Sequence, residues 1–210
     1  MADDLIFYTN PMSRGQIARW ALEEAGASYE TVVLDYASTM KQEPYLSINP
    51  MGKVPAIVHR GHVVTECAGI CAYLADAFPE AGLAPTPAER AGYYRWFFFA
   101  AGPIEQAVTN MAMGFAPSAE QGRMAGYGNY DLAVDVLEKA VAAHPYIAGD
   151  RFTAADVYIG SQVVWGTQFG TLPKRAAFDD YAGRVTERAA YKRAREIDAA
   201  LIAAAQATAS

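Results

Sequence analysis

The stretch Asn49-Pro-Met-Gly-Lys-Val-Pro-Ala-Ile57 decides the fold of this chain. Its Asn-Pro and Met-Gly pairs predict a turn that leads directly into a strand beginning at Pro55. Proline has no N–H for a sheet ladder, so it is tolerated at the first position of a strand and rarely inside one. Because an X-Pro bond prefers trans by only ~0.5–1 kcal/mol, we expect a cis Val54-Pro55 bond, with the backbone of Val54 turned outward to pair with a peptide-like ligand.

A second signal follows at Thr65-Glu66-Cys67, which stands directly before an apolar helical run at residues 70–74. The first N–H groups of a helix have no partner inside it, and the helix dipole attracts negative charge. The sequence therefore predicts an anion site, suited to a carboxylate, in front of this helix.

Strand and helix patterns alternate on both sides of these signals. The expected elements are a strand at 5–9, a helix at 13–25 ended by Gly26, a strand at 29–34, a short helix within 38–48, a hairpin of 56–59 and 62–64, and a helix at 67–77. This β-α-β and β-β-α order is typical of a thioredoxin-like α/β domain.

Helix starts replace strand patterns beyond residue 85. Capping boxes, in which two side chains three residues apart bond each other's backbone N–H, are expected at 86–89, 118–121 and 153–156. We assign Thr153 and Asp156 of the last box to folding rather than chemistry. The expected organisation is a thioredoxin-like domain at 1–78, a linker at 79–87 and an all-helical domain at 88–210.

The composition narrows the class of protein. The chain has 210 residues, of which 52% are hydrophobic and 19% charged, and a formal net charge of -6. Nucleic acids and anionic membranes need clustered Lys and Arg, so the composition argues against both as partners. The N-terminus lacks a basic leader and the chain lacks an apolar run of bilayer length, which favours a cytoplasmic protein. Cys67 and Cys71 have no nearby His or Cys cluster, so we expect packed thiols and no metal site.

Together, the Gly-x-Val-Pro turn at 52–55, the Glu66-Cys67 pair and the box at Thr153 resemble the cytosolic glutathione transferases, most closely over residues 5–77. The resemblance implies the two-domain fold of that family, glutathione as co-substrate, no further cofactor, and a homodimer. It also implies conjugation of glutathione to small hydrophobic electrophiles, a detoxification reaction, with glutathione peroxidase as a side activity. A non-catalytic protein of the same fold that binds glutathione or hydrophobic ligands is the alternative.

By the same resemblance, residues of the turn and of the helix start bind glutathione. Val54, before Pro55, would pair with the cysteinyl backbone, and Glu66 would face the γ-glutamyl amine. Cys67 stands where the family usually has serine and would hold the γ-glutamyl carboxylate. Since a thiol is a weak donor, the backbone N–H must carry more of this contact, and we expect an affinity for glutathione below that typical of the family.

Three basic residues are further candidates by resemblance. Lys41 and Lys53 are placed like residues that meet the glycine carboxylate in serine-class relatives. The alternative for both is a solvated surface lysine, and it has more weight for Lys41. Arg14 would lie next to the thiol and steady its thiolate, or else be exposed.

Two residues compete to activate the glutathione thiol, which in this family receives a hydrogen bond from a Tyr, Ser or Cys near the end of the first strand or the start of the first helix. Ser13 lies in a Pro-x-Ser segment similar to that of the plant-type serine classes, and Tyr8 precedes Arg19 at a spacing similar to that of the tyrosine classes. Ser13 could also be a plain helix cap, and Tyr8 a core aromatic of its strand. We favour Ser13, because its hydroxyl can accept from the Gln16 N–H and still donate to a thiolate. The absence of cysteine at position 13 disfavours thiol-exchange activities.

The electrophile would bind between the domains, against apolar side chains. The candidates are Met12, Met111, Met113, Phe115 and Trp165. Apolar side chains at helical spacing belong to a core more often than to a pocket, which is the alternative for all of them.

Overall fold

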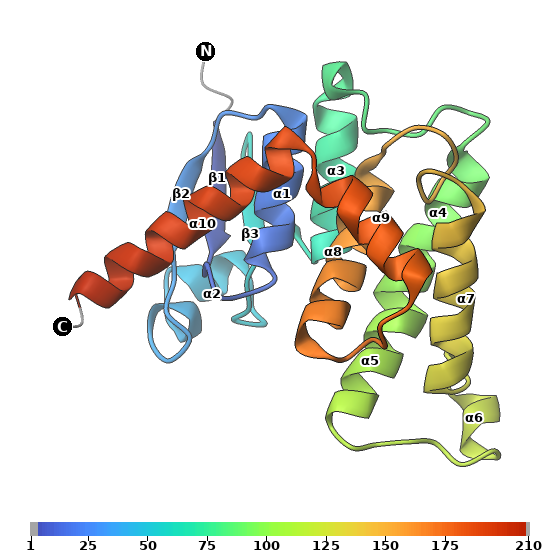
Figure 1. The fold of residues 1–210 in the computed structure, drawn as a ribbon. Helices are drawn as coiled ribbons and strands as arrows, with labels where there is room; N and C mark the ends of the chain where they lie inside the picture. The colour runs from blue at the N-terminus through green and yellow to red at the C-terminus, as the bar shows by residue number, and fades with distance from the viewer. Residues whose placement is uncertain (1–3, 209–210) are drawn as a thin grey trace. The chain divides into compact units, whose positions relative to one another are not determined.

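The computed structural model describes residues 4–208, and their contacts divide the chain into two compact units (Figure 1). The first unit contains residues up to Leu83 together with those from Arg188 onward, and the second contains Ala84–Glu187. The first unit is built around a β-sheet and the second is helical. The predicted fold class, a thioredoxin-like domain followed by helices, is confirmed.

The sheet of the first unit has four strands in the order β2-β1-β3-β4. The strands are β1 (Leu5–Thr9), β2 (Glu30–Val33), β3 (Ala56–His59) and β4 (His62–Thr65). β1 is parallel to β2 and antiparallel to β3, which is antiparallel to β4. Arg60 and Gly61 form the hairpin turn with φ of 51° and 78°, the left-handed values that tight hairpins require. The expected strands and hairpin are therefore present, with β2 one residue shorter at each end than expected.

Helices pack around this sheet. The long ones are α1 (Gly15–Ala25), α3 (Cys67–Ala77) and α10 (Ala189–Thr208), and the short ones are η1 (Thr39–Lys41), α2 (Tyr45–Ile48) and η2 (Pro79–Ala81). α1 packs against both α3 and α10 (Figure 1). The apolar residues Ile17, Ala18, Ala21, Leu22 and Ala25 of α1 are buried, and Gly26 ends this helix with a φ of 63°, as predicted.

The two faces of β1 meet different neighbours, because successive side chains of a strand point to opposite sides. Phe7 faces α1, where the Arg19 guanidinium lies 5.0 Å from the centre of its ring. Tyr8 points to the other face, where it packs on a buried cluster and its ring lies 5.5 Å from that of Tyr45. The cluster consists of Leu34, Met40, Tyr45 and Ala56. Tyr8 and Arg19 thus lie on opposite sides of the sheet.

Helix α10 belongs to the first unit, whereas the sequence-based range for the second domain runs through 88–210. Arg19 on α1 and Asp198 on α10 are both buried, and the Arg19 Nε lies 2.7 Å from the Asp198 Oδ1. Trp20 and Tyr191 add an edge-to-face ring contact at 4.9 Å. The predicted linker at 79–87 and the other domain limits remain predictions.

The second unit consists of helices joined by short turns. They are α4 (Arg90–Phe99), the π-helical turn η3 (Ala100–Ile104), α5 (Glu105–Ala112), α6 (Gln121–Met124), α7 (Tyr130–Ala143), α8 (Ala154–Phe169) and α9 (Ala176–Thr186). α8 is buried over most of its first half. Within residues 4–208 there is no helix whose length and apolar character would suit a membrane span.

Two of the three expected capping boxes, at 118–121 and 153–156, are confirmed by reciprocal bonds, and the pair at 86–89 makes one of the two bonds. The Thr86 N–H donates to Glu89 Oε2 at 2.8 Å. The Ser118 N–H donates to Gln121 Oε1 at 2.8 Å, and the Gln121 N–H donates to Ser118 Oγ at 3.2 Å. The Thr153 N–H donates to Asp156 Oδ2 at 2.9 Å, at the start of α8. The box at Thr153 directly precedes α8, whereas the other two pairs hold turns after which α4 begins at Arg90 and α6 at Gln121.

Candidate functional site

The turn that precedes β3 is held together by its own polar groups. The Lys53 carbonyl accepts hydrogen bonds from Asn49 Nδ2 at 2.7 Å and from the Tyr45 hydroxyl at 2.5 Å. Gly52 has a φ of 55°, and a Cβ at this position would lie 2.9 Å from the Met40 carbonyl oxygen. Only glycine meets both requirements without strain. The turn is therefore held in a defined shape by its own residues.

The Val54-Pro55 bond in this turn is cis, as predicted, and a second cis bond at Glu43-Pro44 was not expected from the sequence. Val54 makes no backbone hydrogen bond with another residue among those described. Its side chain packs on the same cluster as Tyr8. The backbone of Val54 therefore remains available for pairing with a ligand.

Two predicted lysines lie at this turn. The Lys41 Nζ donates a short hydrogen bond to the Gly52 carbonyl, which brings Lys41 from η1 to the turn although most of its side chain is exposed. Lys53 is part of the turn and is exposed. The structure thus brings Lys41 and Lys53 together at the turn that contains Val54.

The start of α3 carries a strained residue. Glu66 is exposed and has φ 62° and ψ 123°, a backbone conformation that residues other than glycine rarely adopt. Such a conformation costs on the order of 1–3 kcal/mol, and residues that keep it concentrate in functional sites. Glu66 leads directly into Cys67, the first residue of α3, and the first N–H groups of a helix point toward whatever lies in front of it.

The thiol of Cys67 is directed toward the start of α1. Its Sγ lies 3.5 Å from the carbonyl oxygen of Arg14, and the residue is buried. Cys71, one turn further along α3, is fully buried, and burial raises the pKa of its thiol well above the ordinary value. The contact from Cys67 to Arg14 brings the starts of α1 and α3 together, and with them the predicted residues Ser13, Arg14, Glu66 and Cys67.

The hydroxyl of Ser13 has two partners in its own loop. It donates to the Asn10 carbonyl at 2.6 Å and accepts from the Gly15 N–H at 2.9 Å. The prediction that it accepts from the Gln16 N–H is wrong, because that N–H bonds to the backbone carbonyl of Ser13 at 3.2 Å. The reason is the helix boundary, since α1 begins at Gly15 with the exposed Arg14 as its cap residue.

The alternative candidate, Tyr8, is half-buried against the cluster around Tyr45. Its spacing to Arg19 does not place the arginine beside it, because the Arg19 side chain is buried on the opposite side of the sheet. There Arg19 pairs with Asp198 and donates to the Tyr29 hydroxyl at 3.1 Å. The resemblance of the spacing to that of the tyrosine classes therefore has no counterpart in contacts around Tyr8.

The candidate electrophile residues are mostly exposed. Met12 is 74% exposed in the first unit, while Met111 and Phe115 of the second unit are 44% and 48% exposed. Met113 is exposed as well, and Trp165 on α8 is half-buried with its ring edge-on to Phe169 at 6.4 Å. These side chains are not core residues of their units, and a shared pocket for them stays a prediction.

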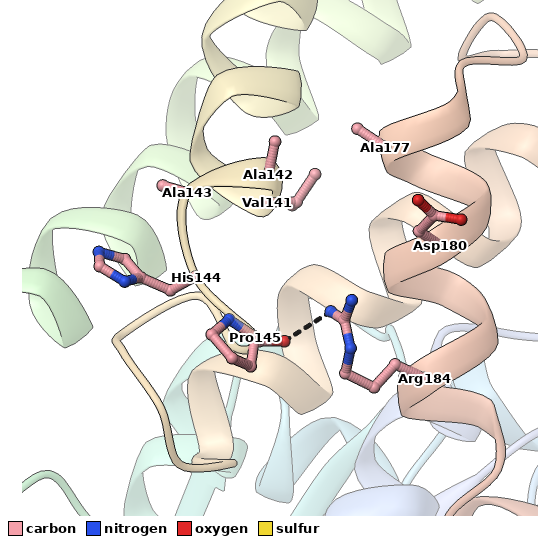
Figure 2. Close-up of a pocket in the computed structure, with 8 residues that line it drawn as sticks. All are labelled: Val141, Ala142, Ala143, His144, Pro145, Ala177, Asp180 and Arg184. Atoms are coloured by element: carbon pink, nitrogen blue, oxygen red, sulfur yellow. Dashed lines mark hydrogen bonds between the residues drawn. The ribbon is translucent and has the colours of Figure 1, made fainter.

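The second unit has a groove of its own (Figure 2). It has a volume of about 500 Å³ and runs between the end of α7 with the following loop and the side of α9. Arg184 crosses it to donate to the Pro145 carbonyl at 2.6 Å, and Asp180 stands one turn before it on α9. None of the predicted site residues lines this groove.

Comparisons with known proteins agree with this arrangement. The family model described as the glutathione S-transferase N-terminal domain matches residues 3–76, which contain the turn, Glu66 and Ser13. Glutathione S-transferase 3 of Zea mays is 31% identical over 166 residues, covering 72% of this chain and 73% of the relative. Glutathione S-transferase GST-4.5 of Xanthomonas campestris pv. campestris is 28% identical over 187 residues, covering 85% and 91%.

Solved structures extend the similarity over both units. The structure of a sphingomonad glutathione S-transferase complexed with glutathione has a TM-score of 0.74 and 30% identity, and the match covers 92% of this chain and 98% of that one. A glutathione transferase from Methylococcus capsulatus gives a TM-score of 0.76 at 27% identity, covering 93% and 98%. The cis-proline turn, the strained glutamate before α3 and these similarities over most of the length lead to one assignment: the chain belongs to the glutathione S-transferase family.

Proposed function

We propose that this protein is an enzyme that conjugates the sulfur of glutathione to small hydrophobic electrophiles. The observation that carries the proposal is the contact between the Cys67 thiol and the Arg14 carbonyl, because it joins the two helix starts that family resemblance assigns to glutathione. One helix start offers N–H groups to a carboxylate and the other presents Ser13. The solved structure of the sphingomonad glutathione S-transferase described above is a complex with glutathione, and this similarity supports the same ligand for the present chain.

In this proposal the tripeptide binds as an added strand beside the turn. The N–H and C=O of Val54 pair with the cysteinyl residue, and the exposed carboxylate of Glu66 meets the γ-glutamyl amine. The γ-glutamyl carboxylate sits at the start of α3, on the N–H of Cys67. Lys41 and Lys53 lie at the turn and attract the glycine carboxylate at the other end of the tripeptide.

Ser13 stabilises the thiolate by donating a hydrogen bond from its hydroxyl to the sulfur, while the proton of the thiol is released to solvent. A free thiol titrates near ~8.5, and one pKa unit corresponds to ~1.36 kcal/mol. A helix N-terminus contributes ~0.3–2 kcal/mol to an anion and a charge-assisted hydrogen bond ~1.5–3 kcal/mol. These sums lower the thiol pKa by roughly one to three units, so that much of the bound glutathione is thiolate at neutral pH. The sulfur then forms a bond to the electrophilic carbon, and the leaving group departs with the bonding electrons; no metal or further cofactor takes part.

The test is turnover of a generic aryl halide with glutathione. Ser13→Ala should lower kcat by about tenfold or more, the value of one charge-assisted hydrogen bond, while Tyr8→Phe should retain most of it. Ser28→Ala, an exposed serine of the same unit, is the matched control. Full activity in Ser13→Ala with loss in Tyr8→Phe would transfer the role to Tyr8, and full activity in both would remove both assignments.

A non-catalytic glutathione-binding protein is the second candidate, and one observation favours it. The Cys67 thiol is directed to a backbone carbonyl of its own chain, so the γ-glutamyl carboxylate loses the side-chain donor that serine usually provides. Saturable glutathione binding by the wild type without turnover of any aryl halide or organic peroxide would favour this candidate. Reduction of a peroxide would add the proposed peroxidase side activity.

We also propose a homodimer, as the family resemblance implies. Tyr94 and Phe98 stand one turn apart on α4 and are 50% and 73% exposed, which gives this helix an unpartnered aromatic stripe. A second copy of the chain would cover it. Sedimentation equilibrium should give a dimer for the wild type and a monomer for Phe98→Glu, and a wild-type monomer would refute the proposal. The cytoplasmic location expected from the sequence stays a prediction.

A further inference from the structure

The loop that carries Ser13 is held by the side chain of Asn10. Its Nδ2 donates to the Leu34 carbonyl at 2.8 Å, just beyond the end of β2. Its Oδ1 accepts from the Met12 N–H at 2.9 Å. Asn10 therefore uses both ends of its amide, one toward the neighbouring strand and one within the loop.

The bond to Leu34 replaces a backbone bond that the sequence does not allow. The Leu34 N–H donates to the Thr9 carbonyl at 2.8 Å, which continues the parallel ladder of β1 and β2 by one step. In a parallel ladder every second residue bonds, so the Leu34 carbonyl would next accept from the N–H of residue 11. Residue 11 is proline and has no N–H, and the amide of Asn10 supplies the missing donor.

The backbone carbonyl of Asn10 in turn sets the hydroxyl of Ser13. This carbonyl accepts from the Ser13 N–H at 3.0 Å and from the Ser13 Oγ at 2.6 Å. When Ser13 turns its proton to a bound thiolate, the carbonyl keeps the Ser13 N–H and the Thr9 hydroxyl, which lies 3.4 Å away. No buried acceptor is left without a partner by that rotation, which keeps its free-energy cost low.

We propose that Asn10 is a positioning residue for thiol activation: by anchoring the loop to β2, it fixes the direction in which Ser13 presents its hydroxyl. The inference rests on the proposed function of Ser13. Neither the amide nor the carbonyl of Asn10 touches glutathione in this account, and Asn10 acts only through Ser13. Gln16 secures the far side of the same loop, since its Nε2 donates to the Pro11 carbonyl at 2.6 Å.

Three variants separate positioning from general stability. Asn10→Asp keeps an acceptor for the Met12 N–H and sets a carboxylate oxygen against the Leu34 carbonyl, while Asn10→Ala removes both bonds. Asn129→Ala is the matched control, because the Asn129 side chain likewise accepts from a nearby backbone N–H, that of Leu132 at 2.9 Å, but belongs to the second unit. Thermal unfolding of each variant shows that it is folded at the assay temperature.

The readout is the thiol pKa of glutathione bound to each full-length protein, measured from the thiolate absorbance as the pH is varied. Both Asn10 variants should raise this pKa by about half a unit or more, the value of a lost neutral hydrogen bond, and lower kcat with little change in the KM for the electrophile. The effect should vanish when Ser13 is already alanine, and Asn129→Ala should leave the pKa unchanged. In the Asn10→Ala background, Pro11→Ala returns an N–H to the ladder and should recover part of the shift.

Each result decides between two claims. A wild-type thiol pKa equal to that of free glutathione would overturn the proposed function and this inference with it. A lowered wild-type pKa that persists in both Asn10 variants, or an equal effect of Asn10→Ala with and without Ser13, would overturn the positioning role alone. No recovery by Pro11→Ala would contradict the replacement of the missing N–H.

Discussion

At the scale of single residues, the site departs from its family at Cys67. A serine hydroxyl is a stronger donor than a thiol, and the Cys67 thiol lies against the Arg14 carbonyl rather than facing outward. In the proposed function the carboxylate of glutathione therefore depends on backbone N–H groups at the start of α3.

We expect Cys67→Ser to bind glutathione more tightly, by about fivefold, because one added hydrogen bond to a charged group contributes ~1 kcal/mol after competition with Arg14. Isothermal titration calorimetry measures the change. Cys71→Ser is the control, since Cys71 is fully buried one turn along and should lose stability without gaining affinity. Equal or weaker binding by Cys67→Ser would show that the side chain at 67 does not meet the ligand.

Tyr45, whose hydroxyl donates to the Lys53 carbonyl in the turn before β3, predicts a dependence of stability on alkaline pH. Burial raises its pKa from 10.0 to about 12. Between these two values the folded chain binds more protons than the unfolded one. The contribution of Tyr45 to stability is therefore fully present below pH 10 and is lost as the pH rises toward 12. Urea unfolding at several pH values should show this decline, and Tyr45→Phe should reduce its slope. The remainder comes from other groups whose pKa burial raises, among them Tyr29, to about 12, and Tyr181. An unchanged slope in Tyr45→Phe would be evidence against the effect.

At the scale of elements, the sequence predicted where many elements begin and less about what they contact. Capping boxes and turn pairs act within a few residues, so the starts of the helical segments after Thr86, Ser118 and Thr153 could be recognised. The start of α1 was placed two residues early, because Ser13 fits a capping pattern that the loop at Asn10 and Pro11 uses differently. The π-helical turn η3 has no local signature beyond Pro103.

The start of α8 depends on Asp156 more than a helix cap usually does. Its Oδ1 accepts from the Ile147 N–H and the Tyr181 hydroxyl, both at 2.7 Å, and its Oδ2 accepts from the Thr153 N–H and hydroxyl. Asp156→Ala should lower the free energy of unfolding by about 2–4 kcal/mol, because it leaves several buried donors without partners. Ser118→Ala removes an exposed cap and should cost about 1 kcal/mol or less. Equal losses in the two variants, measured by urea denaturation, would contradict this role of Asp156.

At the scale of the whole molecule, the chain returns to its first unit after the second. Helix α10 comes back to α1 through Arg19 and Asp198, which are 179 positions apart in the sequence. A single sequence gives no sign that two charges so far apart form a buried pair, which is why α10 was assigned to the helical domain. The local backbone structure around Val54, Glu66 and Ser13 was more predictable, because these residues carry local turn and helix-start signals.

The Arg19–Asp198 pair should dominate the docking of α10. Arg19 Nη2 and Asp198 Oδ2 have no hydrogen-bond partner within residues 4–208, so the pair depends on one short contact. Asp198→Ala should destabilise the protein by about 3–5 kcal/mol, because it leaves a buried guanidinium unpaired. Arg19→Met with Asp198→Leu should recover most of the loss.

Arg193→Ala is the control for this experiment, because Arg193 pairs with Glu23 on the surface and its side chain is 73% exposed. Such a pair contributes about 0–1 kcal/mol. Thermal unfolding measures the loss of stability in each variant. A loss in Asp198→Ala no larger than that in Arg193→Ala would show that other contacts hold α10.

The central claim is that this protein lowers the pKa of the glutathione thiol. The most direct test is a pH titration of the thiolate absorbance of glutathione bound to the wild-type protein, beside free glutathione in the same buffer. The account predicts a pKa roughly one to three units below that of the free thiol. Saturable binding with an unshifted pKa would contradict it and identify the protein as a glutathione-binding scaffold.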